Sequence, residues 1–405
     1  MKPVVYSQLE GKKFGFYGLL ALLGAVILIG LGAAYYMEHQ GHWVTGMNNQ
    51  IVWGMPHIFA IFLILAASGV LNVASIGSVF KKPIYKPLGR LSGLLAITLL
   101  VGGLCVLVLD LGHPDRLVVA MTHYNFKSIF AWNVILYSGF MGIVAIYLWW
   151  MMERQMQKYY PIAGFVAFIW RLMLTTGTGS IFGFLVAREA YDTAILAPLF
   201  IAMSLALGLA VFLLVLIATY KWADRPLGDV ILRRLNSLLG VFVGVVFYFV
   251  LAYHLTNLYI TESHGIEYFV LVNGGIFTVT FWVGQILIGS ILPLLNIYVF
   301  EFGKTTVGIV VSSFLVILGG FAQLFVVIIG GQSYPLEIFP GMTVTDSAFF
   351  DAATKHIYEP SLWELLLGLG GVAFAIFITI LAMRILQFLP NSLADADVDP
   401  HTKKA

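Results

Sequence analysis

The sequence predicts an all-α integral membrane protein with ten transmembrane helices, and three observations carry this prediction. Apolar residues make up 60% of the 405 residues and charged residues only 10%, whereas a soluble chain carries about a quarter charged residues. The mean hydropathy is +0.93. Ten segments reach the length of about 20 apolar residues that a membrane-crossing helix needs. This composition excludes a cytosolic enzyme, a nucleic-acid-binding protein and a disordered scaffold.

The ten predicted spans follow one another along almost the whole chain. They cover Phe14–Met37, Ile51–Phe80, Gly89–Leu109, Ser128–Met151, Pro161–Ala187, Ile195–Tyr220, Ser237–Ile260, Tyr268–Val299, Val307–Gly331 and Leu362–Leu386. The second and eighth are long enough to tilt or bend, and Gly289 and Pro293 are the predicted bend points in the eighth. Lys2, Lys12 and Lys13 precede the first span as in a signal peptide, but its apolar run is too long, so we expect a retained helix.

The distribution of Lys and Arg predicts the orientation of the spans. If the N-terminus lies in the cytoplasm, 17 of the 22 basic residues fall in cytoplasmic segments. The other five are Arg116, Lys127, Arg188 and Lys355 on the outer side and Arg171 inside the fifth span. We therefore expect both termini in the cytoplasm and an outer face with net negative charge.

Two connecting segments have a distinctive composition. Residues 332–361 form the longest outer loop, and its stretch Tyr334–Gly341 contains two prolines and a glycine, which favour a rigid, turn-rich structure. A loop of this length covers a site, docks a partner or simply connects two spans. The tail at residues 387–405, which includes Asp395, Asp397 and Asp399, is predicted to be solvated and disordered in the cytoplasm.

Ionisable side chains inside spans are costly, so each one is a candidate for function. His57 is expected about two turns inside the outer end of the second span, after Trp53 and after Pro56, which is expected to bend the helix. The same face continues inward with three polar residues at helical spacing, Ser68, Asn72 and Ser75. These residues either line a hydrated proton path or bond neighbouring helices together.

Asp110 and His113 end the third span at the same outer level, three residues apart and just before Pro114. A carboxylate beside an imidazole can accept and pass protons. The alternative is a simple helix end, with Asp115 and Arg116 as a surface ion pair.

Further polar residues lie in the other spans. Arg171 shares one face of the fifth span with Thr175 and Thr178. A buried guanidinium needs a carboxylate, carbonyls or water, so Arg171 either belongs to a proton path with Thr175 or anchors the helices. The secondary candidates are Glu189, just beyond that span, and His254 with Asn257, near the outer end of the seventh. The remaining polar residues are predicted to bond helices together: Asn273, Thr280, Gln285 and Gln323.

No resident cofactor is expected. Cys105 is the one cysteine, and an iron–sulfur cluster needs about four thiolates. His57 and His254 are five helices apart and form no haem-ligand pattern. No metal site is predicted.

Three short motifs point to a family. Trp53–Pro56, Asp110–Pro114 and Gly330–Leu336, together with the ten spans, resemble the NrfD/PsrC family of quinone-interacting membrane subunits of respiratory complexes. The motifs look closest to the DsrP branch, part of the Dsr transmembrane complex of sulfur-metabolising bacteria. The resemblance covers nearly the whole chain.

The resemblance implies an architecture and a site. Residues 51–187 and 195–331 would each form a four-helix bundle, with residues 14–37 and 362–386 as peripheral helices. An exchangeable quinone would bind near the outer face of the first bundle, beside His57 and Asp110, with Trp53 and His113 close by. His113 stands where many relatives have Arg, so residue 113 is either a structural cation or a titrating group.

The resemblance also implies a function in a bacterial cytoplasmic (inner) membrane. The chain would carry no redox cofactor and exchange electrons between menaquinone or ubiquinone and a periplasmic ferredoxin-like iron–sulfur subunit, within sulfur metabolism. Multihaem cytochrome c and haem b membrane subunits are further possible partners, membrane lipid surrounds the chain, and nucleic acid is not expected. Two alternatives stay open: a proton-coupled secondary transporter, using Arg171 and a helix break at Gly289–Pro293, and a purely structural anchor for redox subunits.

Overall fold

The computed structural model describes residues 4–10, 14–335 and 358–398. Within them, ten helical segments are long and apolar enough to cross a membrane, so the predicted all-α membrane architecture is confirmed. Seven spans are single α-helices: α1 (Phe14–Gln40), α2 (Met55–Ser78), α5 (Ile129–Met152), α6 (Tyr160–Gly183), α7 (Leu196–Trp222), α8 (Asp229–Tyr259) and α14 (Leu362–Ile385). α3 (Gly89–Leu109) follows a short 3-10 turn, η2 (Pro83–Leu88). The protein is therefore a multi-pass membrane protein.

The other two spans contain π-helical turns, in which each hydrogen bond spans five residues. The eighth consists of α10 (Ile276–Val279), the π-helix η7 (Thr280–Ile291) and α11 (Leu292–Tyr298). The ninth consists of α12 (Thr306–Leu324), the π-helix η9 (Phe325–Gly330) and α13 (Gly331–Ser333). Short helices α4 (Leu117–Thr122) and α9 (His264–Tyr268) and the π-turn η6 (Phe269–Asn273) lie between spans.

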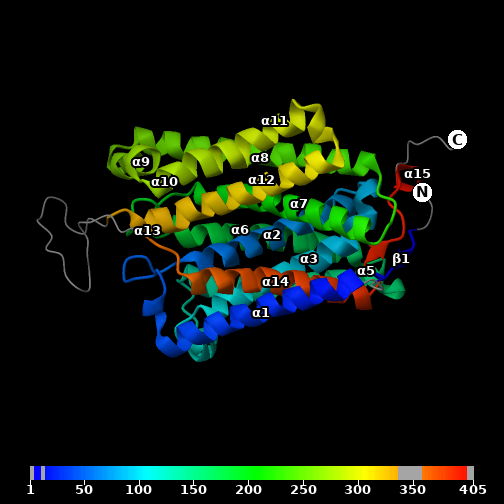
Figure 1. Cartoon of the computed structure of the whole chain (residues 1–405), viewed down its shortest axis with the longest axis horizontal. Coiled ribbons are helices and arrows are strands. Elements are labelled where there is room, and N and C mark those ends of the chain that lie inside the picture. The colour runs from blue at the N-terminus through cyan, green and yellow to red at the C-terminus, as the bar shows by residue number, and fades with distance from the viewer. Residues whose placement is uncertain (1–3, 11–13, 336–357, 399–405) are drawn as a thin grey trace, which may run out of the picture.

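The spans run side by side along the long axis of the molecule, and both described ends of the chain lie at one end of it (Figure 1). We call this the terminal end. The opposite end, here the loop end, holds the connections at residues 41–54, 110–128, 184–195 and 260–275.

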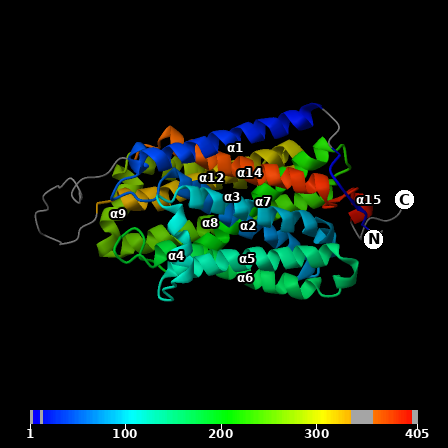
Figure 2. The same ribbon diagram turned by 90° about the horizontal axis from the view of Figure 1, so that it is seen from below.

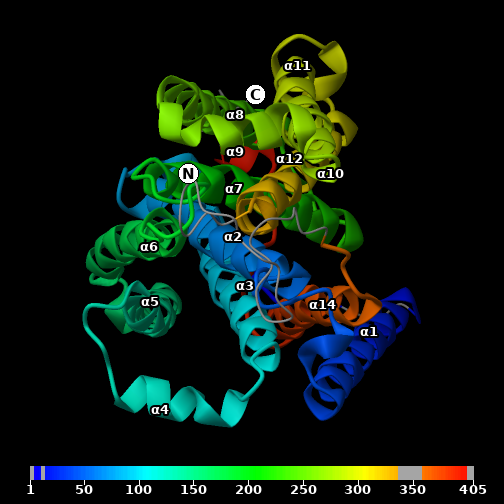
Figure 3. The same cartoon turned by 90° about the vertical axis from the view of Figure 1, so that its left-hand side faces the viewer.

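α2 is the central helix of the molecule. Viewed along the spans, it lies among α3, α6, α7 and α14 (Figure 3), and 94% of its most apolar window is buried. At its crossing with α7, a Cβ on Gly69 would lie 3.0 Å from the Cα of Gly208. The two glycines therefore let the backbones touch, and this contact joins the two halves of the protein.

The spans fall into two groups and a peripheral pair. α2, α3, α5 and α6 form the first group, and α7, α8, the eighth span and α12 form the second. α1 packs along α14, which in turn packs on α3 and α2. Figure 2 shows α1 and the α5–α6 pair on opposite sides of the molecule.

The break in the eighth span does not lie where the sequence predicted it. The backbone stays helical through Gly289 and Pro293, and Pro293 lies in the first turn of α11. The interruption is at Gly274–Gly275, where Gly275 has a φ of 60°. That conformation is easy for glycine and strained for other residues, so the break belongs at the loop end and not at mid-depth.

The prediction of a disordered tail is wrong for its described part. β2 (Leu389–Pro390) pairs with β1 (Tyr6–Ser7) in an antiparallel ribbon, and α15 (Asp395–Val398) follows it. The Asp395 carboxylate accepts a hydrogen bond of 3.1 Å from the Val230 N–H in the first turn of α8. Asp399 and most of the predicted turn at residues 334–341 lie outside the described residues.

Candidate functional site

His57 and Asp110 meet at the loop end of the first group. His57 is the third residue of α2, and Asp110 directly follows α3. His57 Nδ1 lies 3.0 Å from Asp110 Oδ2, and the two side chains are 21% and 1% exposed. His57 lies in the first turn of α2 and not two turns inside, because the helix begins at Met55. Pro56 opens this helix without bending it, at a position that suits proline.

The Asp110 carboxyl lacks ordinary hydrogen bonds. Among the described residues, neither of its oxygens receives an aligned hydrogen bond, and the His57 ring N–H does not point along the 3.0 Å contact. A buried carboxylate without donors is costly unless it is protonated or faces a cation. The contact therefore places an imidazole against a buried carboxyl group, which is the arrangement of an acid–base site.

An aromatic wall lies beside this pair. The Trp53 ring centroid is 6.4 Å from that of His57, 6.1 Å from Phe130, 5.4 Å from Phe182 and 6.4 Å from Tyr191. These rings come from α2's leading segment, α5, α6 and the loop after α6. Such a wall suits a flat, apolar ring system whose polar edge faces His57.

The segment that carries Trp53 is fixed by the side chains of Gln332 in α13 and of Arg188 in the loop after α6. Gln332 Oε1 accepts hydrogen bonds from the N–H groups of Val52 and Trp53, and its Nε2 donates to the Trp53 carbonyl over 3.0 Å. Arg188 donates to the carbonyls of Gln50 and Gln332. Partial burial lowers the pKa of Arg188 from its usual value. The backbone before His57 is thereby tied to α13 and to the loop after α6.

A second anchor comes from the start of α14. The Tyr358 hydroxyl donates to Glu364 Oε1 over 2.5 Å and accepts from the Met55 N–H over 2.7 Å. Glu364 Oε2 also accepts from the N–H groups of Gly46 and Ser361. Burial, followed by the charge of Glu364 and by Asp110, raises the pKa of Tyr358, so the hydroxyl keeps its proton.

Three residues that support the site, Glu364, Tyr358 and His42, were missed by the sequence-based prediction. Glu364 lies in the first turn of α14 and is fully buried. Its capping-box spacing with Ser361 is a signal that could have placed it. Tyr358 carries no such signal. His42, whose Nε2 lies 3.0 Å from the Asp110 carbonyl, comes from a loop with no motif.

His113 does not join the pair. Its Nδ1 lies 3.7 Å from Asp115 Oδ1, and the two side chains are 64% and 74% exposed. α3 ends at Leu109, so the helical spacing that would place Asp110 and His113 on one side does not extend to residue 113. Asp115 therefore faces His113, whereas the sequence suggested that Asp115 pairs with Arg116.

The polar residues predicted along the first group converge on Arg171. This side chain is 2% exposed and donates to Asn72 Oδ1 over 3.1 Å. Ser68 and Thr175 both donate to the Arg171 carbonyl. Among the described residues, Nε and Nη1 of Arg171 have no hydrogen-bond partner. Ser75 instead bonds the Leu71 carbonyl of its own helix.

Two side chains of α5 lie between this cluster and the loop end. Tyr137 and Thr178 hydroxyls are 3.2 Å apart, and Asn133 donates to the Gly177 carbonyl over 3.0 Å. α2 and α6 run antiparallel and meet at Ser68 and Arg171, so Thr178 lies between the level of Arg171 and that of His57. Neither Asn133 nor Tyr137 was among the predicted residues, although their spacing places them on one helical face.

The secondary candidates separate into two places. His254 Nδ1 lies 2.8 Å from Glu267 Oε2, and Asn257 donates to Glu267 Oε1 over 2.9 Å; His254 and Asn257 belong to α8, and Glu267 to the short helix α9 beside it. Glu189 lies exposed in the loop after α6. The prediction that Gln285 and Gln323 bond helices together is wrong for one atom of each: Gln285 Oε1 and Gln323 Nε2 have no hydrogen-bond partner among the described residues.

An apolar cavity of about 520 Å³ lies between α2, α7, α12 and α14, and neither His57 nor Asp110 lines it. Within the described residues, no three His, Cys, Asp or Glu side chains gather closely enough to hold a metal ion.

Known proteins with similar sequences include membrane components of oxidoreductases. One is the Hdr-like menaquinol oxidoreductase integral membrane subunit of Archaeoglobus fulgidus, 27% identical over 98% of this chain and 99% of its own length. A second is a selenate reductase subunit of Mesobacillus selenatarsenatis, 23% identical over 88% of this chain and 91% of its own. A third is a putative dimethyl sulfoxide reductase membrane subunit of Halobacterium salinarum, 28% identical over 95% and 92%.

A family match places the chain more firmly than any single relative. The family described as "Polysulphide reductase, NrfD" matches residues 43–335, which include every span from α2 to α12 and the residues His57, Asp110 and Gln332. The resemblance to the DsrP branch stays a prediction. Since the match covers most of the sequence, the chain belongs to the polysulphide reductase NrfD family.

Proposed function

We propose that this protein is the quinone-reactive membrane subunit of an electron-transfer complex, and that it oxidises or reduces quinone at the His57–Asp110 pair. The observation that carries the proposal is this buried imidazole–carboxyl contact of 3.0 Å, beside the aromatic wall of Trp53. The similarity to a menaquinol oxidoreductase membrane subunit supports it.

The chemistry of quinol oxidation fits these two groups. A quinol gives up two protons and two electrons. His57 Nδ1 faces Asp110, so Nε2 is the nitrogen available to a quinol hydroxyl. His57 accepts the first proton at Nε2, and the Asp110 carboxylate beside Nδ1 offsets the positive charge of the imidazolium. Once that proton has left Nε2 for solvent, His57 accepts the second proton at Nε2, while the electrons leave one at a time; quinone reduction reverses these steps.

The electrons need a carrier on another chain. Cys105, half-buried in α3, is the one thiol of the sequence, too few for an iron–sulfur cluster. We propose that a partner with cysteine-bound iron–sulfur clusters docks on the loop end, on the extracytoplasmic side, with both chain termini in the cytoplasm. The charge distribution supports this orientation. A role in sulfur metabolism, and further cytochrome partners, belong to the same proposal.

The alternative as a secondary transporter loses one of its supports. That function relied on a broken helix at mid-depth, but the backbone stays helical through Gly289 and Pro293. The turnover experiment described next distinguishes the proposed function from that of a purely structural anchor.

The test is quinol turnover by the complex purified through a tag on this chain. His57→Ala and Asp110→Asn should each lower kcat by about 10²-fold or more, as expected for lost acid–base catalysis, while the complex keeps all of its components. His113→Ala is the matched control, because that histidine is exposed and faces Asp115; its turnover should equal wild type. Wild-type turnover in both site variants would favour the anchor.

A further inference from the structure

The second group of spans holds an ionisable cluster that the proposed quinone site does not use. Glu267, 1% exposed, binds His254 through one oxygen and Asn257 through the other, at 2.8 and 2.9 Å. The His254 side chain is 12% exposed, so this cluster lies just beneath the surface of the loop end. Its ring packs edge-on against Phe281, 4.7 Å between centroids, and against Tyr253.

Two small cavities continue inward from this cluster. The first, of about 30 Å³, is lined by His254 and Tyr253 and also by Gln285 and Gln323. The second, of about 20 Å³, is lined by the same two glutamines together with Ser290 and Met203. A buried water needs about 10–15 Å³ of such volume and two to four polar partners. Each cavity therefore has room for water.

The two glutamines supply the polar partners. Gln285 and Gln323 are 5% and 3% exposed, and among the described residues Gln285 Oε1 and Gln323 Nε2 have no hydrogen-bond partner. One is an acceptor and the other a donor, and both side chains line both cavities. A water that donates to Gln285 Oε1 and accepts from Gln323 Nε2 satisfies both atoms. Without water, each of the two buried atoms would lack a hydrogen bond, and each would cost free energy.

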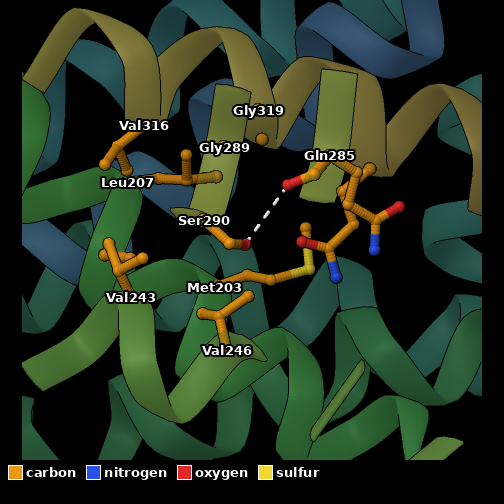
Figure 4. A pocket seen from close by; sticks show the side chains of 12 residues that line it. Met203, Leu207, Val243, Val246, Gln285, Gly289, Ser290, Val316 and Gly319 are labelled. Atoms are coloured by element: carbon orange, nitrogen blue, oxygen red, sulfur yellow. Dashed lines mark hydrogen bonds between the residues drawn. The ribbon is translucent and has the colours of Figure 1, made fainter. Parts of the chain in front are cut away.

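The backbone of the eighth span is adapted to this place. Gln285 and Ser290 both lie in the π-helix η7, and the Ser290 hydroxyl donates to the Gln285 carbonyl over 3.2 Å (Figure 4). π-helical turns occur frequently at functional sites. Beyond Ser290, the apolar side chains of Val243 and Val316 complete the lining of the inner cavity (Figure 4).

We propose that the second group of spans holds a hydrated proton inlet, in which the His254–Glu267 pair loads protons from the loop end onto water bound by Gln285 and Gln323. Each transfer breaks one N–H or O–H bond and forms another on the next group, so the path needs no redox partner. The inlet is separate from the His57–Asp110 pair, which lies in the first group.

The water is tested by X-ray hydroxyl-radical footprinting of the full chain in nanodiscs, where bound water is activated in place. Met203 is 1% exposed and lines the inner cavity, and methionine oxidises readily. Met37, 0% exposed, lines neither cavity and serves as the internal control. We expect Met203 to be oxidised several-fold more than Met37. Equal oxidation of the two would overturn the proposal.

Two variants identify the residues that hold the water. Gln285→Leu and Gln323→Leu keep most of the side-chain volume and remove the polar atoms, so each should lower Met203 oxidation towards the Met37 level. Oxidation that stays at the wild-type level in both would contradict the assigned water site.

The proton step is tested in the complex reconstituted in liposomes, and this arm rests on the proposed quinone function. Glu267→Gln should lower the number of protons translocated per electron by at least half while quinol turnover stays at the wild-type rate. Glu262→Gln, an exposed acid on the same loop, is the control. An unchanged ratio of protons to electrons in Glu267→Gln would overturn the inlet. Absence of quinol turnover in the wild-type complex would instead overturn the proposed function, and the footprinting result would then decide the inlet.

Discussion

The Tyr358 hydroxyl lies between the Glu364 carboxylate and the Met55 N–H, and so joins the start of the last span to the start of α2. Met55 is two residues before His57. The position of the candidate imidazole thus depends on a helix that belongs to the peripheral pair and on the segment just before it.

Tyr358→Phe should destabilise the protein and slow quinol turnover. It leaves Glu364 Oε1 and the Met55 N–H without their partner, and each buried polar group left unpaired costs about 1–3 kcal/mol. The measurement is the melting temperature in detergent together with turnover of the complex. Tyr259→Phe, at a side chain 90% exposed, should change neither. A melting temperature equal to wild type in Tyr358→Phe would contradict the anchoring role.

Gln332→Glu should loosen the segment before α2. The change removes the donor that serves the carbonyls of Trp53 and Ile328, at a side chain 1% exposed. The Ile328 carbonyl keeps its hydrogen bond from the Tyr191 hydroxyl, so we expect a loss of about 1 kcal/mol or more, mainly from the Trp53 carbonyl that loses its donor. Limited proteolysis should then cut faster within residues 41–54. Gln157→Glu, on the surface, provides the comparison and should leave the cleavage rate unchanged.

Asn72 and Arg171 should be coupled energetically. Asn72→Leu removes the side-chain partner of a buried guanidinium, and a hydrogen bond to a charged group is worth about 1.5–3 kcal/mol. Arg171→Met removes the charge itself, so the double variant should be more stable than Asn72→Leu alone. A double-mutant cycle of unfolding free energies measures the coupling. Strictly additive effects would show that the two side chains act independently.

Asp395→Ala should weaken the start of α8. Its carboxylate accepts from the Val230 N–H, one of the first-turn groups that a helix cannot satisfy itself. The expected loss in unfolding free energy is about 1 kcal/mol, as for other helix caps. Amide hydrogen exchange should become faster in residues 229–233 and stay unchanged in α14. Asp192→Ala, exposed in the loop after α6, is the control. Equal exchange in both variants would mean that the tail does not cap α8.

The fold was largely predictable because a membrane leaves few choices for an apolar chain. Hydropathy alone located every span, with errors at helix ends and at the interruption of the eighth span. Gly289 and Pro293 were predicted bend points because such residues often interrupt helices, but Gly289 lies inside the π-helix η7 and Pro293 in the first turn of α11, where proline fits. The tail looked disordered because its acids are hydrophilic, whereas Asp395 and the β1–β2 ribbon are fixed by contacts with distant parts of the chain.

The site was predictable only at residues whose side chains seldom occur inside membrane spans. His57, Asp110 and Arg171 stand out because charged groups seldom occur in spans, and the structure gives each of them a polar neighbour. Tyr358 and His42 reach the site from loops, where one tyrosine or histidine looks like any other. His113 was misplaced because helical spacing was extended past the end of α3.

The pairing of α1 with α14 sets an order on how the protein is made. α1 has its main helical contact with α14, and its apolar window is only 17% buried in the folded molecule. Because α1 is synthesised long before α14, it lacks that helical partner in the membrane until α14 has followed. The β1–β2 ribbon likewise joins segments made early and late, so it forms only after α14 has been synthesised.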